Sequence, residues 1–204
     1  MATTSRGRAA SSSKVAIPQL PWDQVRPAPV VLVSGTETVL ADRAIRLLRD
    51  ILRAEDPSLE VSDIDAGAYA PGELLTLASP SLFAEPRLIR AGNVDKMTDA
   101  FLDEAMAYLQ APADETYVVL RYPSGTRGKK LLDAIRAGTG GGIEVVCAEL
   151  KRDSDKQDFV VAEFRSANRK ITGGALRALV SAFTDDLAEL AAACQQLLAD
   201  TTDD

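Results

Sequence analysis

The apolar run at residues 30–33 constrains the fold of this chain most, because Ser34-Gly35 and an amphipathic segment follow it at once. A short run that is apolar on both faces is typical of a strand buried inside a parallel sheet. From Leu40 to Leu52, apolar side chains recur at helical spacing, with charged residues between them. This strand–turn–helix unit predicts an α/β domain.

Four further strand-like runs follow this unit, and helical segments lie between them. We expect the strands at residues 59–64, 87–91, 116–120 and 143–147, and the helices at residues 73–78, 98–109 and 129–137. Strands that alternate with helices predict a mainly parallel sheet over residues 29–150. Residues 151–204 have no strand-like run, and helical patterns at 155–168, 172–183 and 187–198 predict a small three-helix domain.

The first 28 residues differ from the rest in composition. They hold three consecutive serines, three prolines and four basic residues against the single acid Asp23. Because few core-forming side chains interrupt this pattern, we expect residues 1–28 to form a disordered tail. Trp22 is the one large aromatic residue in it, and we expect it to fix the end of the tail to the folded body.

Composition excludes several classes of function. The 204 residues include no histidine, which removes the commonest general base and most zinc catalysis. Cys147 and Cys194 lack paired spacing, so burial is expected rather than a disulfide or a zinc site. The net charge of −7 disfavours DNA binding through the whole surface but leaves room for a local basic patch. No apolar run approaches the ~18 residues of a membrane span, so we expect a cytoplasmic protein with no membrane partner.

The loop after the first strand lies where a phosphate-binding loop would lie in such a fold. Its sequence, Ser-Gly-Thr-Glu-Thr at 34–38, lacks the lysine and the hydroxyl position of the GxxxxGK[ST] motif. We interpret Gly35 and Thr36 as a degenerate phosphate loop. Gly35 then makes a tight turn, and Thr36 or Thr38 caps the next helix.

A second loop, residues 123–130, also connects a strand to a helix. It contains Gly128-Lys129, but Pro123 stands at its first glycine position and Lys130 at the position of the magnesium-binding hydroxyl. We therefore expect Arg127, Lys129 and Lys130 to form a basic patch that faces DNA or a partner protein. A phosphotransferase or ATPase that uses Lys129 remains the alternative. The acidic pairs look like helix caps, so no catalytic residue, metal site or cofactor is expected.

The order of these parts resembles the delta subunit of the bacterial DNA polymerase III clamp loader. The resemblance covers about residues 29–200. It rests on the degenerate loop at 30–38, on Ser81-Leu82-Phe83 ahead of the third strand, on the basic segment 126–132 and on Phe-Thr-Asp-Asp-Leu at 183–187. No single motif is specific, but their order and spacing together are.

The resemblance implies an AAA+-like sheet domain followed by a helical lid-like domain, in a subunit without catalysis of its own. Such a subunit binds and helps to open the sliding clamp (the beta subunit) within a DNA polymerase holoenzyme, and Ser81, Leu82 and Phe83 match the clamp-binding segment. It also implies the other loader subunits (tau/gamma and delta prime) and, through the complex, DNA as partners. The family's collar domain is absent from this sequence, which disfavours stable assembly. A DNA-binding scaffold is a further alternative, and a Leu-Phe pair can also belong to a core.

Overall fold

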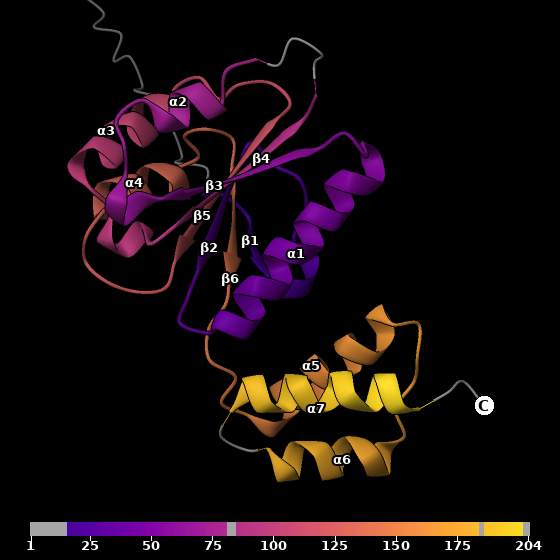
Figure 1. Ribbon diagram of the computed structural model, residues 1–204. Coiled ribbons are helices and arrows are strands. Elements are labelled where there is room, and N and C mark those ends of the chain that lie inside the picture. Colours follow the sequence, from indigo (N-terminus) through magenta and orange to yellow (C-terminus); the bar gives the residue numbers. More distant parts are fainter. Residues whose placement is uncertain (1–15, 81–84, 184–185, 202–204) are drawn as a thin grey trace, which may run out of the picture.

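A computed structural model describes residues 16–80, 85–183 and 186–201 of the chain. Its centre is a six-stranded parallel sheet with the order β1-β6-β2-β5-β4-β3 (Figure 1). The strands are β1 (Gln19–Pro21), β2 (Val30–Ser34), β3 (Glu60–Asp65), β4 (Arg87–Gly92), β5 (Thr116–Tyr122) and β6 (Ile143–Val146). The five strands predicted from the sequence are confirmed, and β1 is an addition.

Helices cover both faces of the sheet. Helix α1 lies on one face, and the three helices α2, α3 and α4 lie on the other (Figure 1). Their bounds are α1 (Thr38–Glu55), α2 (Glu73–Leu77), α3 (Asp99–Tyr108) and α4 (Lys129–Arg136), and short 3-10 turns occur at Trp22–Gln24, Ala66–Ala68 and Val94–Lys96. The predicted α/β fold class is confirmed.

Strand alternation divides the buried residues into two cores. In β2, Val31 and Val33 point into the core beneath α1, whereas Val30 and Leu32 point into the core beneath α2–α4. All four side chains are at most 1% exposed. The continuous apolar run is therefore explained by a central strand that is covered on both faces.

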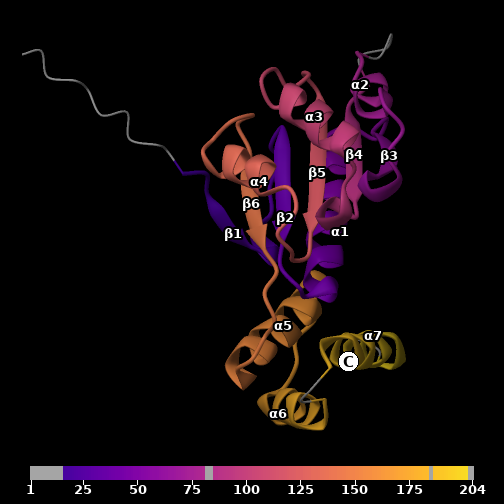
Figure 2. The ribbon, with the colours of Figure 1, turned by 90° about the vertical axis from the view of Figure 1, so that its left-hand side faces the viewer.

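The C-terminal residues form the three predicted helices, α5 (Asp153–Ser166), α6 (Gly173–Ala182) and α7 (Leu187–Asp200). They lie beyond the end of the sheet, and their buried residues join the core beneath α1 (Figure 2). Arg43 of α1 donates from Nε and Nη2 to the two carboxylate oxygens of Glu163 in α5, at 2.8 and 2.7 Å. This buried ion pair fixes the helical part to the start of α1.

The prediction of a disordered tail over residues 1–28 is wrong for residues 16–28. Strand β1 lies within this segment and pairs in parallel with β6. Ile17 and Val25 are buried, and the ring of Trp22 packs 5.7 Å from that of Phe159 in α5, as expected for an anchor. The edge of β6 carries backbone groups that need hydrogen-bond partners, and a three-residue strand satisfies them although its own composition is poor for a strand.

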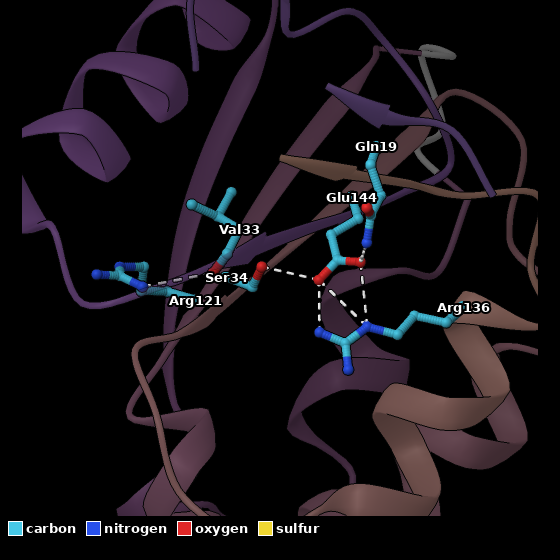
Figure 3. Close-up of polar contacts among 6 residues, drawn as sticks. All are labelled: Gln19, Val33, Ser34, Arg121, Arg136 and Glu144. Carbon is cyan, nitrogen blue, oxygen red and sulfur yellow. Dashed lines mark hydrogen bonds and ion pairs between the residues drawn. The ribbon is translucent and has the colours of Figure 1, made fainter. Parts of the chain in front are cut away.

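A buried carboxylate fixes this added strand. Glu144 of β6 is 1% exposed and accepts hydrogen bonds from Gln19 of β1 at 2.9 Å, from Ser34 of β2 at 2.8 Å and from the Arg136 guanidinium of α4 (Figure 3). Burial acts to raise the pKa of Glu144, but the hydrogen bonds from Arg136, Gln19 and Ser34 outweigh it, so that its pKa is lowered. The Glu144 side chain thus links β6 to β1, β2 and α4.

Candidate functional site

The predicted partner-binding residues Ser81, Leu82 and Phe83 lie outside the described residues. The structure describes the supports on either side of them, which are helix α2 before the segment and strand β4 after it. The contacts of α2 and β4 fix the positions of the residues that flank the segment.

Helix α2 is held in place by the neighbouring helix α3. The Glu104 carboxylate accepts from the Gly72 backbone N–H at 2.6 Å and from the Tyr69 hydroxyl at 2.5 Å, and that hydroxyl accepts from the Leu74 backbone N–H at 2.7 Å. The Tyr69 ring meets the Phe101 ring edge-on at 5.1 Å. Burial, together with the bond to Glu104, raises the pKa of Tyr69 to about 12. A five-residue helix is not stable alone, so these contacts define its position.

Arg87, the first residue of β4, holds the other end of α2. Its Nη1 donates to the carbonyl oxygen of Leu77 at 2.9 Å and to that of Ser79, and its Nε lies 3.1 Å from a Glu60 carboxylate oxygen. A cation at the C-terminus of a helix is also favoured by the helix dipole. On the far side, Pro86 is buried, and its carbonyl accepts from the Glu60 N–H at 3.0 Å. The two ends of the candidate segment are therefore fixed.

Leu75 exposes an apolar side chain on the same helix. At 48% it is the more exposed of the two large hydrophobic residues that stand out to solvent in the described part of the chain, and the other is Val146 at 39%. It precedes Ser79 by one helical turn, and the Ser79 hydroxyl donates to its carbonyl at 2.8 Å. Leu75 was not identified as a candidate from the sequence. A helix that buries Leu74 and Ala78 on one face turns Leu75 toward solvent, and this spacing was the available signal.

The degenerate phosphate loop is closed by its own backbone contacts. Gly35 has φ +118°, donates its N–H to Tyr122 O at 3.1 Å and accepts from Arg121 Nη1 at 2.8 Å. A Cβ at this position would lie 2.2 Å from the carbonyl oxygen of Cys147, so glycine is required. The chain bends at Gly35 and Thr36, and the nearby backbone N–H groups bond to other strands and loops rather than across a local turn. Thr36 is exposed beside it.

The predicted threonine cap of α1 is wrong, because Glu37 caps the helix. Its carboxylate accepts from the Val39 N–H at 3.3 Å, and its own N–H donates to Cys147 O at 3.0 Å. Thr38 is the first residue of the helix instead. The N-terminus of a helix attracts anions, and here a carboxylate of the chain already occupies that position. This arrangement disfavours a bound phosphate at the loop.

The predicted basic residues after β5 are not brought together as one free patch. Arg127 pairs with Asp99 at 2.7 Å and also donates to the carbonyl of Met97, so that it ties this loop to the start of α3. Lys129 and Lys130 begin α4 and are exposed. Of the three basic residues, Arg127 is therefore bound to the start of α3, whereas Lys129 and Lys130 are not.

The remaining candidates for chemistry are buried. Cys147 and Cys194 are free thiols in the cores, and burial raises the pKa of each to about 11. Within residues 16–80, 85–183 and 186–201, no group of three or more thiol or carboxylate ligands could hold a metal ion. In the same ranges no helix has the length and apolar character needed to cross a membrane.

This arrangement of sheet and helices is similar to the solved structure of the Bacillus subtilis DNA clamp loader delta protein (YqeN), with a TM-score of 0.61 and 21% identity. The chain has the fold of a clamp-loader delta protein. The match covers 84% of this chain and 53% of YqeN, so the chain spans about half the length of that protein. The predicted resemblance is thereby confirmed for the fold.

Two other solved structures are more distant. NtrX from Brucella abortus in complex with ADP matches with a TM-score of 0.43 and 13% identity, over 90% of this chain and 49% of NtrX. Drosophila ORC bound to DNA matches with a TM-score of 0.34 and 10% identity, over 86% and 48% of the two chains. These scores are too low to carry an argument. No family model and no curated protein matches the sequence.

Proposed function

We propose that this chain is a noncatalytic clamp-loader subunit that binds the sliding clamp through Ser81, Leu82 and Phe83 and helps to open it. The observation that carries the proposal is the support of this apolar segment: α2 and β4 hold both of its ends through Arg87, in a fold similar to that of a clamp loader delta protein. We propose that the exposed Leu75 of α2 adds a further apolar side chain to this contact.

The energetics of such a contact are sufficient. Removing a Leu or Phe side chain from water contributes about 1.5–3 kcal/mol, and a micromolar complex requires about 8 kcal/mol. Leu75, Leu82 and Phe83 together can supply much of that free energy. Fixed ends reduce the conformational entropy that the segment loses on binding, which favours affinity.

Opening a ring requires more than affinity. A ligand shifts a population only if it binds the open form more tightly than the closed form. We propose that other surfaces of the sheet domain supply this preference. The further partners that we propose are the other clamp-loader subunits and, through the assembled complex, DNA, in the cytoplasm.

The phosphate loop supports a role without ATP hydrolysis in this subunit. Glu37 places a carboxylate at the N-terminus of α1, and Gly35 contacts the backbone of neighbouring strands. The nucleotide chemistry of the complex would then belong to other subunits. The polymerase activity belongs to the holoenzyme.

The test is binding to the sliding clamp, measured by surface plasmon resonance with the full chain. The double variant L82A/F83A is expected to bind at least tenfold more weakly, since each tenfold corresponds to about 1.4 kcal/mol, and L75A should weaken binding to a smaller extent. V146A is the matched control, because it truncates an exposed apolar side chain on a strand at the other side of the sheet. Undiminished affinity in L82A/F83A would refute the proposal.

Two alternatives are separated by further measurements. Saturable binding of a labelled ATP analogue with magnesium that disappears in K129A would favour a nucleotide enzyme at the second loop. Salt-dependent binding of the isolated chain to DNA that K129A/K130A weakens would favour a DNA-binding scaffold.

A further inference from the structure

A cleft of about 470 Å³ lies between α1 and the carboxyl ends of β3, β4 and β5, and its lining includes no residue of α2 or of the loop at 34–38. Four arginines line it: Arg46 and Arg49 from α1, Arg90 from β4 and Arg121 from β5. Cavities of 300–1,000 Å³ are typical of sites for small molecules.

The arginines keep donors that the protein does not use. Arg46 is exposed and has no hydrogen-bond or ion-pair partner among the residues that the structure describes. Arg121 is half-buried, and its Nη1 donates to the carbonyl of Gly35 at 2.8 Å and to that of Val33 at 3.5 Å. Figure 3 shows the contact with Val33. An arginine has five N–H donors, so both side chains can bind an anion without losing these contacts.

The carboxylates of the region neutralise only part of this charge. Asp63 forms a bidentate pair with Arg90 at 2.7 and 2.8 Å, and Asp42 lies in the lining near Arg121 without a hydrogen bond to it among the described contacts. Asp50, outside the lining, pairs with Arg49 at 2.7 Å. With Asp50 counted, four guanidinium groups face three carboxylates, which leaves an excess of one positive charge in a chain of net charge −7.

We propose that this cleft binds a compact anion that carries two or more phosphate charges, such as a pyrophosphate or the diphosphate of a small organic molecule. Guanidinium groups bind phosphate oxygens in bidentate geometry. Asp42 and Asp63 in the lining, and Asp50 beside Arg49, disfavour a long polyanion, whereas a compact anion can reach Arg46 and Arg121. Ile45, Ala91 and Val119 form an apolar part of the lining that can contact the organic portion of a ligand.

The test is isothermal titration of the full chain with inorganic pyrophosphate at low salt. Saturable binding at one site is expected, and R46A should weaken it at least tenfold. R46K should have an intermediate affinity, because lysine keeps the positive charge but cannot bind a phosphate in bidentate geometry. K129A/K130A is the matched control: it removes two exposed charges outside the cleft and should leave the affinity unchanged. Because Arg46 is exposed, its substitution should not alter folding.

Titrations with other ligands identify the source of the anion. Tighter binding of adenosine diphosphate than of pyrophosphate would identify an organic diphosphate, whereas equal binding would identify the inorganic ion. Absence of saturable binding, an equal effect of K129A/K130A, or tighter binding of a single-stranded oligonucleotide or a glutamate-rich peptide would overturn the proposal. These results are independent of clamp binding by the α2 segment, so the two proposals can fail separately.

Discussion

Replacement of Glu144 with alanine tests whether a single carboxylate holds the first strand of the sheet. The variant removes the acceptor for Gln19, Ser34 and Arg136. Ser34 is only 8% exposed, and a buried hydroxyl left without a partner costs about 1–3 kcal/mol. Breaking a fully buried ion pair costs about 3–5 kcal/mol, but the Arg136 side chain is 43% exposed and can turn to water. We therefore expect a loss of about 3 kcal/mol in the free energy of unfolding.

The chain contains its own probe for this experiment. Trp22 is the single tryptophan, follows β1 directly and packs against Phe159. Urea unfolding followed by its fluorescence should show a lower midpoint in E144A, and the melting temperature should fall by roughly 6–12 °C. E144Q should lose less stability than E144A, because the amide oxygen of glutamine can still accept a hydrogen bond from Ser34. The matched control is E149A, whose carboxylate is 67% exposed and 3.9 Å from Lys151.

The pH dependence follows from the sign of the pKa shift. Because the pKa of Glu144 is lowered in the folded protein, its contribution is present above its ordinary pKa and is lost as the pH falls through the lowered value. E144Q should therefore reduce the loss of stability in acid. A loss below about 1 kcal/mol in E144A, similar to that expected for a surface pair, would refute the reasoning.

Three further predictions concern other contacts. E163A removes the carboxylate partner of Arg43, whose side chain is 14% exposed, and should reduce the free energy of unfolding by about 3 kcal/mol in denaturant titrations, the low end of the range for a buried pair. Y69F should be less stable than the wild type at neutral pH. Folding raises the pKa of Tyr69 to about 12, so the stabilisation by its hydroxyl is present below the ordinary pKa and is lost as the pH rises toward 12. The difference in stability between Y69F and the wild type should therefore shrink at high pH. Cys147 and Cys194 should react with iodoacetamide at pH 8 only after unfolding, as mass spectrometry would detect.

Each of these expectations has a result that contradicts it. Equal stability of E163A and the wild type would mean that Arg43 finds another partner. A constant difference between Y69F and the wild type up to pH 12 would show that the hydroxyl does not control α2. Rapid labelling of either thiol in the folded chain would show that its core opens readily.

The long strands and helices could be predicted because each carries its own periodic pattern. Strand β1 could not, since Gln-Leu-Pro has no strand pattern and its place is determined by the open edge of β6, which is distant in sequence. The cap of α1 was assigned wrongly for a similar reason. Glutamate is not a favoured N-cap residue, and its place here depends on a backbone contact with Cys147, which follows β6 and is distant in sequence.

The candidate sites divide in the same way. Ser81, Leu82 and Phe83 were found from the order of the motifs, and their role stays a prediction. The contact between α2 and β4 that flanks them depends on Arg87, whose sequence neighbours give no sign that it contacts the end of a helix. The arginines of the cleft come from three separate elements, α1, β4 and β5, and only the fold brings Arg46, Arg90 and Arg121 together.

The contact of Arg87 with Leu77 and Ser79 has a consequence for how such a protein can change. Since Arg87 joins the end of α2 to the start of β4, the contacts that hold the two flanks of residues 81–84 come from residues outside that segment. Doubling the length of a loop costs only about 0.6 kcal/mol in closure entropy. Recognition can then diverge in evolution, or be redesigned by grafting, while Arg87 keeps both flanks of the segment in place.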